Sequence, residues 1–83
     1  MAAPRRRFAT VKDDVNLKPL GATVRRLRRE RGLTQEDLAE KTGLHTNHIG
    51  GVERGERNIT MATLFSLARA LEVKVTVLFE DYG

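Results

Sequence analysis

Apolar residues recur with a helical period along most of the chain from Pro19 onward. In the first such segment Leu20, Val24 and Leu27 follow one another at i, i+4 and i+7, with arginines on the opposite face. This spacing is typical of an amphipathic helix whose apolar side is buried. Gly32 follows the last periodic residue, and glycine commonly ends a helix. We therefore expect a first helix that begins at about Pro19 and stops before Gly32.

Two shorter helices are predicted next, on either side of Gly43. Thr34 and Asp37 have the spacing of a capping box, in which a hydroxyl and an acidic side chain satisfy free backbone N–H groups at the start of a helix. Leu38 and Ala39 are the inward positions of this helix, and Gly43 is expected to end it with a positive φ. The capping box and the glycine thus mark both ends of the helix.

The helix after this turn is expected to run from about Thr46 to Arg54. Ile49 and Val52 are its inward positions. A tight turn that contains glycine forces two such helices to cross steeply, so that the first supports the second. Residues 34–54 are therefore predicted to form a helix-turn-helix.

The rest of the chain is predicted to form a loop, a fourth helix and a short final element. Thr60 caps the fourth helix. Its apolar stripe, which we expect to be core, consists of Met61, Leu64, Leu67, Ala68 and Leu71. Residues 73–77 alternate like a β-branched strand, yet they also suit a short last helix that reaches Phe79. Helices dominate this pattern, so we predict a compact all-α domain of four to five helices.

Residues 1–18 show no helical or strand period, and we expect a flexible basic arm before a single domain at 19–83. The arm contains three consecutive arginines, Arg5, Arg6 and Arg7. Such arms can follow a phosphate backbone or enter a minor groove, but a basic terminus without a partner is an equally open interpretation. No apolar stretch follows the basic start, so a secretory signal is not expected.

Charge is distributed unevenly along the 83 residues, whose formal net charge is +4. Residues 1–31 hold 10 Lys or Arg and 3 Asp or Glu, a net of +7, whereas residues 32–83 hold 5 and 8, a net of −3. A concentration of positive charge at one end fits a polyanionic partner such as nucleic acid, although other basic proteins share this balance.

Several classes of function are disfavoured by what the sequence lacks. Without cysteine there are no disulfides, thiolate metal sites or cysteine nucleophile. No apolar run approaches the roughly 18 residues needed to span a bilayer, so we expect a cytoplasmic protein without a membrane partner. His45 and His48 stand at i, i+3, but two imidazoles without a third ligand make a poor metal site. No catalytic constellation is present, and we expect no enzyme, no cofactor and no small-molecule ligand.

The third helix carries side chains that suit DNA bases. Its outward positions are Thr46, Asn47, His48 and Gly50, all small or polar. An asparagine can bond the edge of adenine, and a threonine methyl can contact the methyl group of thymine. Because the major groove is wide enough for one helix, we expect this helix to enter the groove of double-stranded DNA. Thr46 and Asn47 could instead only satisfy free amides at the helix start.

A resemblance to the Cro/C1-type (XRE) family of helix-turn-helix proteins covers about residues 20–79 and is carried by RRLRRERGLTQEDLAEKTGLHTNHIGGVERGERNITMATLFSLARALEV. Within it, TQEDLAEKTGL and ERGERNIT are most similar to the controller proteins of restriction-modification systems, which are small dimeric autoregulators. The resemblance implies a lambda-repressor-like fold and a sequence-specific transcriptional regulator that binds a palindromic operator as a homodimer. Antitoxins share most of these motifs, so an antitoxin with a protein partner and secondary DNA binding is the alternative.

The resemblance also implies roles for individual residues. Gln35 matches the glutamine that binds a phosphate and braces the recognition helix, and Thr46 and Asn47 match base-contacting positions. Arg57 and Asn58 match a loop that contacts DNA after this helix. The whole set implied to contact DNA is Gln35, His45, Thr46, Asn47, His48, Arg54, Arg57 and Asn58.

Two further pairs of residues follow from the comparison with the family pattern. Arg28 and Glu53 match a structural salt bridge between the first and third helices. Gly50 and Gly51 depart from the pattern by replacing larger residues, and each costs on the order of 1 kcal/mol relative to alanine in a helix interior. Either the backbone approaches DNA closely here, or fewer bases are contacted than in relatives.

Two surfaces have open interpretations. The exposed arginines of the first helix are either a solvated face or a surface that attracts phosphates; they are Arg25, Arg26, Arg29 and Arg31. The apolar residues near the C-terminus exceed what a small core needs, and we expect a dimer surface there. These residues are Val75, Val77, Leu78, Phe79 and Tyr82.

Overall fold

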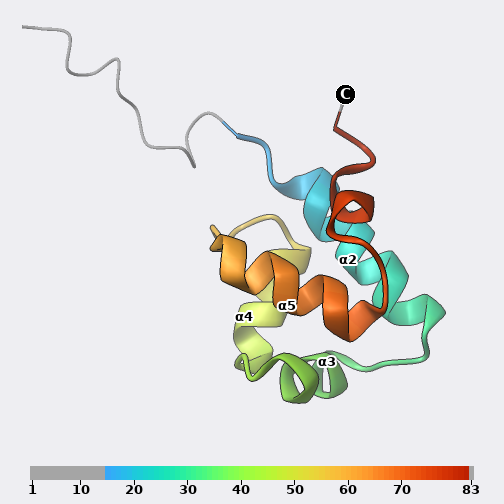
Figure 1. Cartoon of the computed structure of the whole chain (residues 1–83). Helices are drawn as coiled ribbons and strands as arrows, with labels where there is room; N and C mark the ends of the chain where they lie inside the picture. Colours follow the sequence, from blue (N-terminus) through green and yellow to red (C-terminus); the bar gives the residue numbers. More distant parts are fainter. Residues whose placement is uncertain (1–14, 83) are drawn as a thin grey trace, which may run out of the picture.

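Five helical elements follow one another in residues 15–82, the part of the chain described by a computed structural model (Figure 1). They are α2 (Lys18–Glu30), α3 (Gln35–Thr42), α4 (Thr46–Glu53), α5 (Met61–Leu71) and the 3-10 helix η2 (Val75–Phe79). No strand occurs within these residues, so the final element is a short helix rather than a strand. The predicted all-α architecture is confirmed, and no described helix is long and apolar enough to cross a membrane.

The core lies where the apolar faces of all five elements meet. Figure 1 shows α5 crossing the other helices, with η2 returning beside α2, which it contacts. The buried apolar side chains are Leu20, Val24, Leu27, Leu38, Ala39, Ile49, Val52, Leu64, Leu67, Ala68, Leu71 and Leu78. The i, i+3, i+4 pattern therefore identified nearly all of this core, because each helix buries one stripe of its surface.

Two residues differ from the predicted core. Met61 was expected in the stripe of α5, but it is the first residue of that helix and its exposed fraction is 62%. Leu78 was expected on a dimer surface, but it is fully buried in the core of its own chain. The two errors share a cause, since helical spacing does not reveal where a helix projects beyond the core or where a last turn folds back over it.

Local chemistry sets the ends of α3 as predicted. The hydroxyl of Thr34 accepts a hydrogen bond from the backbone N–H of Asp37 at 2.9 Å, and the Asp37 carboxylate accepts one from the N–H of Thr34 at 2.8 Å. The bond from the Thr34 backbone N–H to the carboxylate is the largest cause that holds the pKa of Asp37 below its ordinary value, followed by the Thr34 side chain. Gly43 ends the helix with φ +76°.

The crossing of α2 and α4 depends on Gly21, which the sequence analysis did not single out. A methyl group at this position would clash with the carbonyl oxygen of Val52 and lie 2.5 Å from the carbonyl oxygen of Glu53. Because both obstacles belong to the backbone of α4, only a residue without a side chain allows this approach. The signal in the sequence was a glycine inside a helical pattern, which costs stability unless close packing requires it.

Residues 80–82 hold the start of α2. The hydroxyl of Tyr82 accepts a hydrogen bond from the N–H of Leu20 at 3.1 Å and donates one to the carbonyl oxygen of Asn16 at 2.6 Å. It thereby satisfies a free N–H group in the first turn, where the N-cap residue Leu17 has no polar side chain. Glu80 also pairs with Arg26 of α2. The C-terminal segment is thus part of the packed fold.

Candidate nucleic-acid interface

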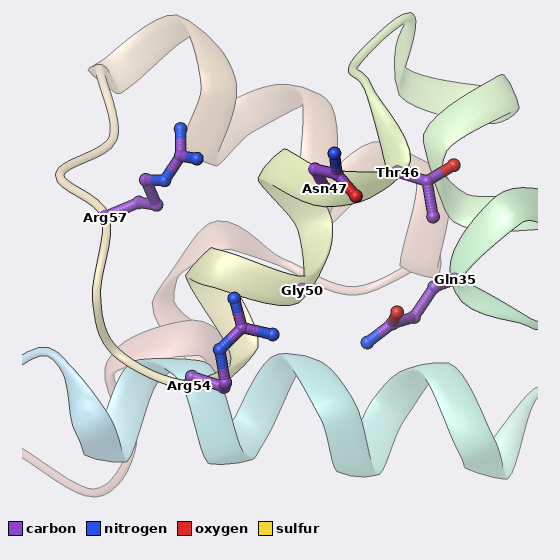
Figure 2. Close-up of a pocket in the computed structure, with 6 residues that line it drawn as sticks. All are labelled: Gln35, Thr46, Asn47, Gly50, Arg54 and Arg57. Atoms are coloured by element: carbon purple, nitrogen blue, oxygen red, sulfur yellow. The ribbon is translucent and has the colours of Figure 1, made fainter.

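The outer face of the helix-turn-helix contains a polar hollow of about 290 Å³. Three elements supply its lining: the start of α3, the outward face of α4, and the loop after α4 (Figure 2). The residues that line it are Gln35, Thr46, Asn47, Gly50, Arg54 and Arg57. The lining therefore brings together two amides, one from each helix, with one hydroxyl and two guanidinium groups. These groups can form hydrogen bonds with base edges and phosphate oxygens.

Thr46 and Asn47 lie at the N-terminal end of α4, and in Figure 2 both side chains project from the first turn of that helix. The turn is capped by His45, whose Nδ1 accepts a hydrogen bond from the N–H of Asn47 at 3.0 Å. Because His45 supplies this cap, Thr46 and Asn47 do not need to satisfy the backbone themselves. Their side chains remain available to a ligand, which favours base contact over the alternative of helix capping.

A buried network joins α2, α3 and α4 behind the hollow. Arg28 donates to Glu53 from Nε at 2.6 Å and from Nη2 at 3.1 Å, and Gln35 donates from Nε2 to the same carboxylate at 3.0 Å. Arg28 also donates to the carbonyl oxygen of Leu33 at 2.8 Å. The hydrogen bond to Glu53 raises the pKa of Arg28 above its already high ordinary value. Gln35 is thus held against the recognition helix while its side chain lines the hollow.

Gly50 and Gly51 are both buried by neighbouring side chains, and Gly50 lies on the outward face of α4, where it lines the hollow. A methyl group on Gly51 would lie 2.5 Å from Cγ of Arg57, and one on Gly50 would lie 3.0 Å from Nη1 of Arg54. Arginine side chains cover both glycines. The two explanations proposed from the sequence were a close approach of the backbone to DNA or fewer base contacts. Neither included arginine side chains that cover the glycines.

The remaining residues of the predicted DNA-contacting set, His45, His48 and Asn58, do not line the hollow. His48 is half-buried on another side of α4, and its Nε2 is buried without a hydrogen-bond partner among residues 15–82. Asn58 is exposed in the loop next to Arg57. The described residues contain no cluster of three or more side chains that could hold a metal ion. Arg5, Arg6 and Arg7 lie outside the described residues.

The exposed arginines of α2 are not equivalent. Arg26 forms ion pairs with Glu30 and Glu80, so its charge is compensated within the chain. The side chains of Arg25, Arg29 and Arg31 are exposed, and no ion pair joins them to another residue between 15 and 82. Attraction of phosphates therefore remains a prediction for these three arginines and is weakened for Arg26.

The predicted dimer surface is only partly exposed. Val75, Val77 and Tyr82 are half-buried against the core, while Phe79 is 39% exposed and its ring meets that of Tyr82 edge to face. Phe65, which was not predicted from the sequence as a surface residue of interest, lies on α5 outside the buried stripe and is 50% exposed. A large aromatic residue on the polar side of an amphipathic helix was the available signal.

Comparisons with known proteins agree with this geometry. The family model HTH_3, described as helix-turn-helix, matches residues 24–78. Control protein C.SmaI of Serratia marcescens is 48% identical over 64 residues, which cover 77% of this chain and 76% of the relative. The crystal structure of the restriction-modification controller protein C.AhdI from Aeromonas hydrophila is 43% identical, with a TM-score of 0.74 over 76% of this chain and 96% of that chain. A structure of the controller protein C.Esp1396I as a tetramer with its natural 35 base-pair operator is 41% identical, with a TM-score of 0.69 over 77% of this chain and 84% of that chain.

Proposed function

The chain belongs to the HTH_3 family of helix-turn-helix transcriptional regulators, and we propose that it is a controller protein that binds a two-fold operator as a homodimer. The observation that supports this most directly is the hollow, because its lining combines base-contacting and phosphate-contacting side chains on one exposed face. We place the activity in the cytoplasm with the DNA that it regulates. The proposal includes no enzymatic chemistry, since the hollow carries no nucleophile with an adjacent base.

In the proposed complex α4 enters the major groove with its N-terminal turn foremost. Thr46 and Asn47 then face base edges, and the two arginines that line the hollow face the phosphates that border the groove. Gln35 lies at the start of α3, where free N–H groups and the helix dipole also favour a phosphate. The hydrogen bond from Gln35 to Glu53 fixes the distance between this phosphate contact and the recognition helix.

A controller protein is favoured over an antitoxin by the extent of the match. The alignment with C.AhdI covers 96% of that chain, so the similarity includes nearly all of a protein of the controller class. An antitoxin needs a second surface for its toxin, and within residues 15–82 the exposed large apolar side chains are only Val15, Met61, Phe65 and Phe79. We assign these to a second copy of the chain, as a two-fold operator requires.

The experiment that tests the proposal is selection of bound duplexes from a random pool, followed by competition with unselected DNA. We expect an inverted repeat with half-sites about one helical turn apart and an affinity that falls steeply with salt. Replacing Thr46 and Asn47 together by alanine should reduce the preference for the selected sequence at least about fivefold, because one good base contact contributes about 1 kcal/mol or more.

The matched control is Thr76→Ala, which removes an exposed threonine from η2 and should leave the preference unchanged. Equal affinity of the unaltered protein for selected and random duplexes would show that it is not a sequence-specific regulator. A preference that survives in the Thr46/Asn47 variant would place the base contacts elsewhere on the surface.

A further inference from the structure

We propose that Gly51 is a positioning residue for DNA recognition: it provides the surface across which the side chain of Arg57 lies, and so holds that guanidinium at the hollow. The inference rests on the proposed function, and it adds a role for a helix residue that acts through another side chain. It explains why the recognition helix carries a glycine in its interior, where alanine would be the better helix former.

The stem of Arg57 lies against the helix backbone. A methyl carbon at position 51 would be 2.5 Å from Cγ, 3.0 Å from Nε and 3.3 Å from Cδ of that arginine. Three successive atoms of the Arg57 side chain therefore lie where a side chain at position 51 would be. If only the tip of Arg57 contacted the helix, a single atom would lie this close.

The loop that delivers Arg57 is fixed at its start. Gly55 has φ +74°, and a methyl group there would lie 2.8 Å from Cα of Lys18 in α2. The chain therefore turns sharply against α2 before it passes α4 again. Figure 2 shows Arg57 reaching from this loop toward the end of α4 that carries Asn47. Backbone geometry thus sets where the arginine begins, and Gly51 sets the path of its side chain.

No carboxylate among residues 15–82 pairs with Arg57, whereas Arg54 pairs with Glu56 at 3.0 Å. The position of the Arg57 guanidinium thus depends on the packing of its stem. Its planar group, left uncompensated, suits two oxygens of one phosphate. Holding a flexible arginine near its bound position reduces the conformational entropy lost on binding. A side chain at position 51 would push the stem off the helix and remove this advantage.

Gly50 supplies a comparison on the same helix, although it also lines the hollow. A methyl group there would meet Nη1 of Arg54 at 3.0 Å, and this is the tip of an exposed and flexible side chain that can move aside. Gly50→Ala and Gly51→Ala therefore make the same chemical change, with the same gain in helix propensity, and differ in which arginine they disturb. Any effect of Gly50→Ala on binding should therefore be the same with or without the Arg57 side chain, whereas the effect of Gly51→Ala should disappear in the Arg57→Ala background.

The test is a double-mutant cycle on the full chain with Gly51→Ala, Arg57→Ala and both together, using a selected operator duplex. We expect Gly51→Ala and Arg57→Ala each to weaken binding on the order of tenfold and to reduce the salt slope by about one unit. The double variant should bind no more weakly than Arg57→Ala alone. Without DNA, Gly51→Ala should raise the melting temperature in the Arg57→Ala background, where the space is free.

Multiplicative losses in the double variant, with the preference for the operator intact, would overturn this inference alone, because the two residues would then act independently. Unchanged binding of Arg57→Ala would overturn it as well. If the unaltered protein showed no preference for the selected duplex, the proposed function would fail, and the inference with it. If Gly51→Ala folds poorly for a reason unrelated to Arg57, the double variant would melt at a lower temperature than Arg57→Ala alone, and this result would also contradict the inference.

Discussion

The carboxylate of Glu53 belongs to α4 and accepts hydrogen bonds from α2 through Arg28 and from α3 through Gln35. The side chains of the ion pair are only 11% and 3% exposed. A buried charge that loses its partner is destabilising, because the remaining charge is desolvated and uncompensated. At the scale of single residues, this carboxylate determines whether the three helices keep their mutual positions.

Replacing Glu53 by alanine should therefore lower the free energy of unfolding by about 3 to 5 kcal/mol, measured by urea denaturation at neutral pH. Glu56→Ala is the control, since it breaks the ion pair between Arg54 and Glu56, in which each side chain is 61% exposed. That change should cost less than about 1 kcal/mol. Similar losses for the two variants would show that the buried network does not stabilise the fold.

Residues differ in how far the sequence could predict their roles. Arg28 and Glu53 were paired from the family resemblance, and the structure brings them together. Gly50 and Gly51 could be recognised as unusual, but not explained. Arg54 covers Gly50 from the C-cap of the same helix, whereas Arg57 reaches Gly51 through a loop whose path no local pattern encodes. His45 was expected to contact DNA, and the structure gives it the local task of capping α4.

Among the elements, α3 has the clearest dependence on pH. The pKa of Asp37 is lowered in the folded state by its hydrogen bonds with Thr34. A lowered pKa means that the ionised carboxylate stabilises the fold above the unfolded value of about 3.9 and that this contribution disappears as the pH falls through the folded value. The capping box therefore supports α3 at neutral pH and weakens in acid.

We expect Asp37→Asn to be less stable than the unaltered protein above about pH 5, with the difference shrinking as the pH falls below about 4. Urea denaturation followed by circular dichroism over this range measures the difference. Glu40→Gln, at an exposed position later in the same helix, is the control and should show no such convergence. A difference between the Asp37 variant and the unaltered protein that stays constant with pH would contradict the assignment.

Helices were predicted better than the contacts between them. Thr34, Asp37 and Gly43 act on neighbours a few positions away, so their spacing alone determines where α3 begins and ends. The approach of α2 to α4 at Gly21 and the bond from Tyr82 to Asn16 join parts of the chain that are distant in sequence. Periodicity describes one helix at a time, and it cannot reveal which backbone another helix will touch.

At the scale of the whole molecule, the assignment of the exposed apolar residues to a dimer surface predicts how substitutions change the association of two copies. Phe65→Glu should shift the protein from dimer to monomer in analytical ultracentrifugation and weaken operator binding, because a carboxylate would replace an exposed ring that we assign to the dimer surface. The monomer should keep its helical content, since Phe65 is half exposed.

Ala22→Glu introduces the same charge at an exposed position of α2 and should leave the mass unchanged. If Phe79→Glu dissociates the dimer and Phe65→Glu does not, the surface is centred on η2, as the sequence indicated. If both variants sediment with the mass of the dimer, the two copies associate through another face.

The network of Arg28, Gln35 and Glu53 also has a consequence for the entropy of association. These side chains are already fixed in the free protein, so DNA does not have to order them. Asn47, Arg54 and Asn58 are exposed, and immobilising each would oppose binding by about 0.5–1.5 kcal/mol. Part of the recognition surface thus loses its conformational freedom once, when the chain folds, and the rest loses it anew at every encounter with an operator.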